Sequence, residues 1–266
     1  MSDNAPLAVV TGASRGIGYE LARRFAAHGF DLVINAEDDA LAAAAEELGA
    51  APVDVRAVQA DLRTEAGVEE LYVAVTSTGR PVDTVALNAG VGQGGAFIDT
   101  DLDDDLAVID LNVVSTVRLA KRFLKEMAAR DEGRMLVTSS IAATVPGSFQ
   151  PVYNASKSFL QSFVQALQEE LKETGVTLTS VMPGPTETDF FRRAGMLDTR
   201  LGRMRKDDPA QVAAQAFDAV MSGRPKLVTG SAATKAQGIA DRVLPDRLKA
   251  AAHRRVAEPG SGRKAG

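Results

Sequence analysis

The chain has 266 residues but no cysteine, no tryptophan and only two histidines, His28 and His253. The lack of cysteine excludes disulfides, thiolate metal sites, iron–sulfur clusters and cysteine nucleophiles. A multi-histidine metal site or a histidine general base would have to be built from two residues that lie far apart in the sequence. We therefore expect no metal site and interpret both histidines as surface residues.

Long apolar runs and an excess of positive charge are absent too. No segment reaches the about 18 successive apolar residues of a membrane span, and the polar start of the chain does not resemble a signal peptide. The 30 Lys and Arg residues stand against 35 Asp and Glu residues, which leaves no basic field for nucleic acid. Because 45% of the residues are hydrophobic, we expect a globular, cytoplasmic protein without a membrane span or a nucleic-acid partner.

Short apolar runs alternate with longer segments of helical periodicity. Strands are predicted over 7–10, 32–34, 53–58, 84–87, 134–138, 176–181 and 226–228. Helices between them include 18–27, 41–48, 106–129 and 153–173, and the aspartates of 99–105 are interpreted as helix capping rather than a metal site. This alternation predicts an α/β fold with a doubly wound, seven-stranded parallel sheet and helices on both faces. No linker is found, so we expect one domain over 1–257 and a disordered tail over 258–266.

A glycine-rich turn follows the first predicted strand and opens the first helix. Its residues are Thr11, Gly12, Ala13, Ser14, Arg15, Gly16, Ile17 and Gly18. Gly12 allows a sharp turn, Gly16 allows the backbone to approach a pyrophosphate, and Gly18 allows the helix to pack on the strand. The free N–H groups of the helix N-terminus would bind the anion, so the sequence predicts a dinucleotide site.

The glycine spacing resembles the T-G-x-x-x-G-x-G motif of the classical short-chain dehydrogenase/reductase (SDR) family. Further marks of that family follow in order over about 7–189. They are Asp61-Leu62, Asn88-Ala89-Gly90, Asn112, Ser140, the run from Tyr153 to Lys157, and Pro183-Gly184 followed by Thr188. The resemblance implies a Rossmann-type fold and an NAD(P)(H)-dependent oxidoreductase that moves a hydride between nicotinamide and a carbonyl or secondary alcohol carbon.

Four residues are the predicted catalytic group. Tyr153 and Lys157 are four positions apart, so on a helix they share one face. A nearby ammonium and a cationic nicotinamide would lower the pKa of the phenol and make Tyr153 the general acid or base. Ser140, at a strand end, would donate a hydrogen bond to the substrate carbonyl oxygen. The resemblance adds Asn112, which would hold a water that links Lys157 to solvent.

The resemblance also assigns cofactor contacts. Asp61 and Leu62 would lie at the adenine, Asn88, Ala89 and Gly90 near the ribose, Tyr153 and Lys157 at the nicotinamide ribose, and Pro183, Gly184 and Thr188 near the nicotinamide. In the turn, Arg15 favours a 2′-phosphate, and so does Ala36, which replaces the aspartate of NAD-preferring relatives. Glu37 stands where NADP-preferring relatives often carry arginine. These signals conflict, and we favour NADP(H) over NAD(H).

The segment 186–206 breaks the strand–helix rhythm and, in this family, is the substrate lid. Its apolar residues, among them Phe190 and Met196, suggest an apolar ketone or aldehyde substrate, with Ala142, Val145, Phe149 and Gln150 as further pocket walls. An alternative is that the lid's Phe and Met residues only pack it onto the body. The cations of the lid would suit an anionic substrate or an acyl carrier protein, although a solvated face explains them better.

The C-terminal segment 235–256 has an amphipathic, basic pattern interrupted by Pro245. It would cover the pocket, join subunits or touch a membrane surface, with packing or oligomerisation favoured. Relatives are commonly dimers or tetramers, so we expect a homodimer or homotetramer. The rival to an enzyme is a non-catalytic nucleotide-binding regulatory or scaffold protein on the same fold, which would have no physical need for all four catalytic residues.

Overall fold

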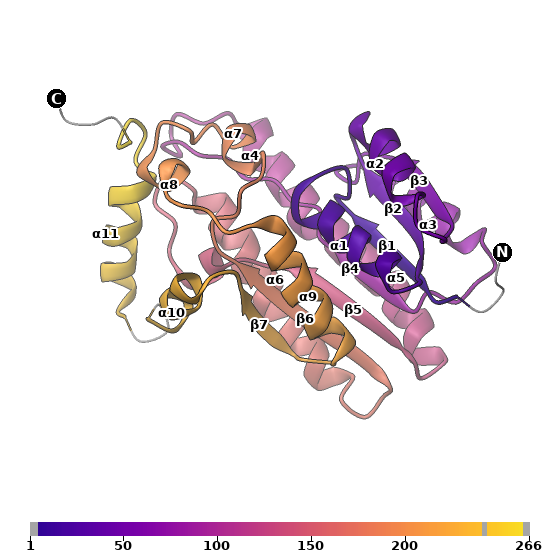
Figure 1. Cartoon of the computed structure of the whole chain (residues 1–266). Coiled ribbons are helices and arrows are strands. Elements are labelled where there is room, and N and C mark those ends of the chain that lie inside the picture. The colour runs from indigo at the N-terminus through magenta and orange to yellow at the C-terminus, as the bar shows by residue number, and fades with distance from the viewer. Residues whose placement is uncertain (1–4, 241–243, 263–266) are drawn as a thin grey trace.

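The computed structural model describes residues 5–240 and 244–262. One sheet of seven parallel strands, ordered β3-β2-β1-β4-β5-β6-β7, forms the centre of the molecule (Figure 1). The strands are β1 (Leu7–Thr11), β2 (Asp31–Ala36), β3 (Val55–Gln59), β4 (Thr84–Leu87), β5 (Gly133–Thr138), β6 (Val176–Pro183) and β7 (Lys226–Thr229). The predicted doubly wound, Rossmann-type sheet is confirmed.

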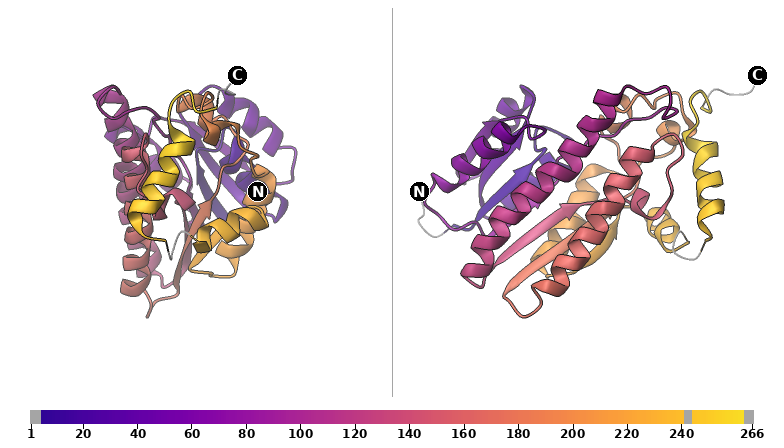
Figure 2. Two further views of the ribbon diagram at one scale, coloured as in Figure 1. Left: turned by 90° about the vertical axis from the view of Figure 1, so that its left-hand side faces the viewer. Right: turned by 180° about the vertical axis from the view of Figure 1, so that it is seen from behind.

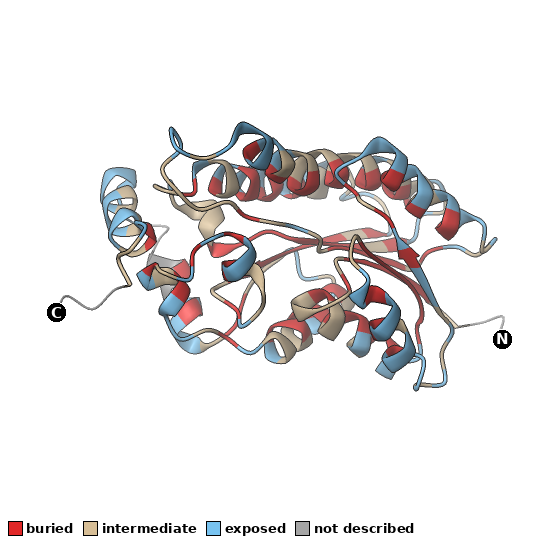
Figure 3. Cartoon of the chain, turned by 90° about the horizontal axis from the view of Figure 1, so that it is seen from above, coloured by how far each residue is buried: buried red, intermediate tan, exposed pale blue. Residues whose placement is uncertain are grey.

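Helices cover both faces of the sheet, as the view along its edge shows (Figure 3). The helices are α1 (Gly16–Ala27), α2 (Ala40–Leu48), α3 (Glu65–Thr76), α4 (Leu102–Ile109), α5 (Ser115–Ala129), α6 (Pro151–Glu170), α7 (Phe190–Arg193), α8 (Arg200–Arg203), α9 (Pro209–Met221), α10 (Ala232–Ala240) and α11 (Asp246–Ala257). Side chains of α3, α5 and α6 pack on one face of the sheet, where Figure 2 shows the two long helices, and those of α1, α2 and α9 pack on the other. No described helix has the length and apolar character that a bilayer crossing requires.

The core consists of two apolar layers because strand side chains alternate between the faces. On β1, Leu7 and Val9 belong to the layer under α5 and α6, whereas Ala8 and Val10 belong to the layer under α1 and α9. Because both layers are buried, the sequence of β1 is a continuous run of apolar residues rather than an alternation of apolar and polar ones.

The predicted helix over 106–129 is not one regular helix. Helix α4 passes into a π-helical turn, η1 (Asp110–Val114), which continues as α5. The side chain of Asp101 accepts a hydrogen bond from the backbone N–H of Asp103 and so caps α4, as the aspartate-rich segment predicted. Within the described residues, no group of His, Cys, Asp or Glu side chains is arranged to hold a metal ion.

The C-terminal segment forms α10 and α11, with Pro245 at the start of α11; part of the predicted helical pair, 241–243, lies outside the described residues. The tail differs from the prediction. Residues 258–262 form turns in which the backbone N–H groups of Gly260 and Gly262 bind Asp198. Composition alone predicted disorder because it contains no sign of this distant carboxylate; residues 263–266 lie outside the described part of the chain.

Candidate active site

A cavity of about 580 Å³ opens at the carboxyl ends of the strands. It lies where the strand order reverses between β1 and β4, the place where doubly wound sheets bind ligands. Every residue predicted above as a cofactor contact lines this cavity, as do Ser140, Ala142 and Phe190. Of the predicted catalytic residues, only Asn112 is absent from its wall.

The glycine turn forms one wall. Gly12 and Gly16 have φ angles of 66° and 60°, the left-handed region that favours glycine. A Cβ on Gly18 would collide with the carbonyl oxygen of Gly12, so this close approach of helix and turn also requires glycine. Helix α1 begins at Gly16 without a side-chain cap, which leaves its first N–H groups for an anion. The turn therefore fits the pyrophosphate of a dinucleotide.

Asn88 fixes the floor of the cavity. Its backbone N–H donates to Thr11 Oγ1 at 3.0 Å, and its side-chain amide donates to the Thr11 carbonyl at 3.1 Å. Thr138 Oγ1 donates to Asn88 Oδ1 at 3.1 Å. These bonds tie together the ends of β1, β4 and β5, so Asn88 holds the floor rigid.

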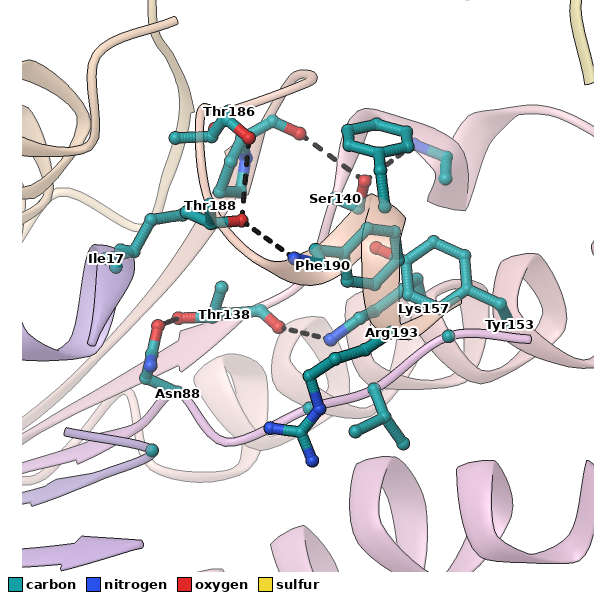
Figure 4. Close-up of a pocket in the computed structure, with 18 of the residues that line it drawn as sticks. Ile17, Asn88, Thr138, Ser140, Tyr153, Lys157, Thr186, Thr188, Phe190 and Arg193 are labelled. Atoms are coloured by element: carbon teal, nitrogen blue, oxygen red, sulfur yellow. Dashed lines mark hydrogen bonds between the residues drawn. The ribbon is translucent and has the colours of Figure 1, made fainter. Parts of the chain in front are cut away.

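Tyr153 and Lys157 lie one turn apart near the start of α6, and both reach the cavity (Figure 4). Lys157 is 4% exposed, and its Nζ donates to the carbonyl of Thr138 at 3.0 Å. That Nζ lies 5.8 Å from the centre of the Tyr153 ring. Ser140, two residues beyond β5, lines the cavity as well; its Oγ donates to the carbonyl of Pro183 at 3.4 Å and accepts from the backbone N–H of Ala142 at 3.1 Å, and its hydrogen-bonding effect on Tyr153 lowers the pKa of the phenol. The structure thus brings together the predicted tyrosine, lysine and serine.

Burial controls the charge of both groups. It raises the pKa of Tyr153 to about 12, against a lowering by the hydrogen bond with Ser140, and it lowers the pKa of Lys157 to about 8. The sequence predicted a lowered pKa for Tyr153. That lowering depends on a bound cationic nicotinamide and stays a prediction; in the chain by itself, desolvation of the phenol outweighs the lowering by the hydrogen bond with Ser140.

Asn112 lies in the π-helical turn η1 and is completely buried. Its Oδ1 accepts from the N–H of Val91, and its Nδ2 donates to the Val91 carbonyl and to Ser156 Oγ, each at 2.9 Å. A Cβ on Gly90 would stand 3.1 Å from both Asn112 Oδ1 and Lys157 Nζ. The side chain of Asn112 thus joins η1 to α6 behind the cavity, with all of its amide atoms engaged by protein.

Charged side chains crowd the end of the cavity beside β2. Arg15 forms ion pairs with Asp38 at 2.9 Å and with Asp189 at 3.0 Å. Asp38 follows β2 by two positions, whereas Asp189 immediately precedes α7. The guanidinium expected to bind a phosphate is therefore shared between two carboxylates.

Glu37 is also paired. Its carboxylate binds Arg63 at 3.0 Å and also Arg193 of α7. Arg63 in turn binds Asp61 at 2.9 Å and lowers the pKa of that carboxyl group. Sequence reasoning missed Arg63 and Arg193 as site residues. Arg63 directly follows the Asp61-Leu62 motif and was open to detection, but Arg193 lies 156 positions from Glu37 and only the fold brings them together.

Gly184 lines the cavity and also packs against α10. A Cβ on it would stand 2.5 Å from Cγ2 of Thr234 in α10, so glycine is needed here for packing as well as for any approach of nicotinamide. Thr188 lies across the cavity from the end of β6, and its Cγ2 would be 2.9 Å from a Cβ on Gly16. The lid therefore closes directly over the glycine turn.

The opposite end of the cavity is apolar. Phe190 lies over Tyr153, with 5.0 Å between the ring centres, and Ala142, Val145 and Gln150 line the wall as predicted. Phe149 and Met196 do not line it. They pack with Phe191, Ala194 and Ala257 in a small cluster beneath the lid. For Met196 of the lid the packing alternative agrees with this contact, whereas Phe149, predicted as a pocket wall, lies in the body and packs against the same cluster.

Helix α11 supplies a further wall, in agreement with the pocket-covering alternative that the sequence left open for the segment 235–256. Leu244, before its start, and Lys249, Ala252, His253 and Val256 on it line the cavity. His253 Nδ1 lies 3.0 Å from the carbonyl of Ser148, and burial lowers the pKa of the imidazole. The prediction of a surface residue is thus wrong for His253, whereas His28 is exposed as predicted.

Comparison with known proteins agrees with this geometry. The family model for short chain dehydrogenases matches residues 6–196. Oxidoreductase UcpA of Salmonella typhimurium is 31% identical over 216 residues, which cover 80% of this chain and 79% of UcpA. A short-chain dehydrogenase/reductase from Burkholderia phymatum in complex with NAD has a TM-score of 0.82 at 25% identity, covering 91% of this chain and 94% of that one. A short-chain dehydrogenase from Sphingobium yanoikuyae in complex with NADPH has a TM-score of 0.77 at 28% identity, covering 84% and 87%.

These findings do not favour a non-catalytic scaffold. The matched residues include the glycine turn, Ser140, Tyr153 and Lys157, and the structure gathers all of them at one cavity. The chain therefore belongs to the short-chain dehydrogenase/reductase family and is an NAD(P)-dependent oxidoreductase.

Proposed function

We propose that the protein is an NADP(H)-dependent reductase of apolar ketones or aldehydes, with Tyr153 as the proton donor. The observation that carries this proposal is the meeting of Ser140, Tyr153 and Lys157 at the point where the glycine-turn end of the cavity joins its apolar end.

The protonation state of Tyr153 favours reduction. With its pKa raised to about 12, the phenol is neutral at pH 7 and ready to donate. Bound nicotinamide would supply the hydride to the carbonyl carbon, while Tyr153 transfers its proton to the carbonyl oxygen. Ser140 would donate a hydrogen bond to that oxygen as negative charge develops. The Lys157 ammonium would stabilise the resulting phenolate. Because the side-chain amide of Asn112 is engaged by Val91 and Ser156, the water that the resemblance places there would have to bind the backbone of this residue rather than its side chain.

The cavity wall supports an apolar substrate. Around Tyr153 it consists mainly of Ala142, Val145, Phe190 and the α11 residues Ala252 and Val256. The α11 wall also carries Lys249, but its ammonium is paired with Asp246 and donates to the carbonyl of Thr144, so its charge is already engaged within the chain. We assign the substrate site to this part of the cavity, with Phe190 above the phenol.

The charges beside β2 bear on the choice of cofactor. Arg15, Arg63 and Arg193 gather there, which favours the 2′-phosphate of NADP(H). Glu37 opposes it, since a carboxylate in this place usually accepts the 2′-hydroxyl of NAD(H). Because Glu37 is held by two of the three guanidinium groups, we retain NADP(H) as the preferred cofactor.

Exposed apolar residues suggest the partner surface. Leu102, Leu106 and Ile109 of α4 and Phe159 of α6 are 66%, 45%, 38% and 42% exposed. Burying them against a second copy would give the homodimer or homotetramer predicted from the sequence. A cytoplasmic location stays a prediction.

Docking of an acyl carrier protein has less support. Among the lid cations, Arg192 binds Asp189, Lys206 binds Glu187, and Arg200 donates to the carbonyl of Ser261. Each is already engaged within the chain, so the charge that the lid offers to an acidic partner is smaller than the sequence suggests.

A panel of ketones and aldehydes tests the function by following the loss of NADPH or NADH absorbance. We expect turnover of apolar carbonyl compounds, faster with NADPH, and little turnover by Tyr153→Phe. Turnover of none of the panel with either cofactor would refute the reductase assignment, and equal or better efficiency with NADH would refute the cofactor preference.

A further inference from the structure

The two sequence signals for the cofactor conflict at Glu37, and the fold resolves this conflict through a residue of the lid. We propose that Arg193 on α7 recognises the 2′-phosphate of NADP(H), and so supplies the cation that position 37 lacks. This inference rests on the proposed NADP(H) preference and adds the residue that determines it.

Arg193 lies in the cavity wall beside Glu37. Its side chain lines the cavity and extends from the lid toward the end beside β2, away from Tyr153 (Figure 4). It binds the carboxylate of Glu37, the residue directly after β2. Because this is where the ribose of a dinucleotide lies in a doubly wound sheet, its guanidinium is within reach of a group on the 2′ oxygen.

Arg193 also balances the negative charge around Glu37. Glu37, Asp61, Arg63 and Arg193 form one connected set with two negative and two positive groups. Without Arg193 the set would be left with one net negative charge next to Glu37, which repels a phosphate. The neighbouring Arg15 has less charge to offer, because two carboxylates, Asp38 and Asp189, share its guanidinium, whereas Arg193 is bound by the carboxylate of Glu37.

The guanidinium of Arg193 is accessible to a ligand. The side chain of Arg193 is 39% exposed and that of Glu37 is 28% exposed, so the pair lies near solvent. A small rotation of the Arg193 side chain would there exchange the Glu37 carboxylate for an oxygen of the phosphate. A phosphate offers the planar guanidinium two acceptors, as a carboxylate does, and carries more charge. A 2′-hydroxyl offers no such exchange, so binding of NAD(H) would not draw Arg193 away from Glu37.

The test uses cofactor fragments and calorimetry, and so does not depend on turnover. Binding of 2′,5′-ADP and of 5′-AMP is measured on the full chain, on Arg193→Gln and on Arg205→Gln. Arg205 is the matched control because it is an exposed cation of the same lid for which the described residues provide no ion pair. We expect Arg193→Gln to weaken binding of 2′,5′-ADP about tenfold, with 5′-AMP and the control variant within about twofold of wild type.

Two outcomes would overturn the inference. Equal weakening of both fragments would mean that Arg193 acts on the 5′-phosphate or on the fold, and no weakening of either would mean that it contacts no phosphate. Arg193→Lys separates charge from structure, since a retained ammonium should restore part of the preference for 2′,5′-ADP. If wild type binds 2′,5′-ADP no more tightly than 5′-AMP, the proposed cofactor preference itself fails, which is distinguishable from a failure of Arg193 alone.

Discussion

Replacement of Lys157 by methionine should change how stability depends on pH. Burial lowers the pKa of Lys157 from 10.5 to about 8, so between these values the unfolded chain binds a proton that the folded chain does not. The free energy of unfolding of the wild type should therefore rise with pH across this window. A depression of the pKa by two to three units means that burying the protonated Lys157 destabilises the fold by about 3 kcal/mol. This destabilisation is present in full below pH 8 and absent above pH 10.5.

The comparison is made at pH 7 and pH 9.5, because the second value lies below the ionisation of Tyr153 in both states. Relative to wild type, Lys157→Met should be more stable at pH 7 than at pH 9.5 by about 2 kcal/mol. Urea unfolding measures this difference, and the loss of the bond to the Thr138 carbonyl cancels because it is the same at both values. Lys121→Met at an exposed position of α5 controls for the loss of a charge. A difference below about 0.5 kcal/mol, or of opposite sign, would refute the account of Lys157 burial.

Three further predictions concern single elements of the site. Tyr153→Phe should lower kcat by about a hundredfold or more, as loss of a general acid does, while NADPH binding measured by its fluorescence stays within about threefold; a full rate would remove Tyr153 from its role. Gln150→Leu should leave the melting temperature unchanged or raise it, because Gln150 Nε2 is buried without a hydrogen-bond partner, and a clear loss of stability would contradict this. Removal of 258–266 should make proteolysis of the lid faster, because Asp198 and Arg200 lose their bonds to the tail; an unchanged rate would show that the tail does not restrain the lid.

The sheet could be predicted from the sequence because its strands are short, apolar and β-branched. All seven predicted strands are present, with ends shifted by at most two residues. The position of Tyr153 next to Lys157 could be predicted for a similar reason, since a separation of four on a helix fixes their relation without any knowledge of the rest of the fold.

Interactions between distant segments could not be predicted in this way. The pairing of Glu37 with Arg193 depends on how the lid crosses the end of β2, and the place of His253 depends on how α11 returns to the cavity. When the partner of a charged or titratable residue lies far along the chain, the sequence alone gives no sign of the pair, and the residue is taken for one that faces solvent. Hence the lid cations were interpreted mainly as a solvated face, with an acidic partner as the alternative, although several of their guanidinium groups bind the chain itself.

Burial affects the charges of Tyr153 and Lys157 together. Desolvation alone disfavours the phenolate of Tyr153 and the ammonium of Lys157, as their shifted pKa values show. When Tyr153 gives up its proton, however, the phenolate appears beside the ammonium, and each charge removes part of the desolvation penalty of the other. Loss of the Tyr153 proton is therefore disfavoured least while Lys157 carries its charge. If Tyr153 is the proton donor that we propose, a site buried in this way would resist loss of its proton to solvent and release it when a carbonyl oxygen is present to receive it.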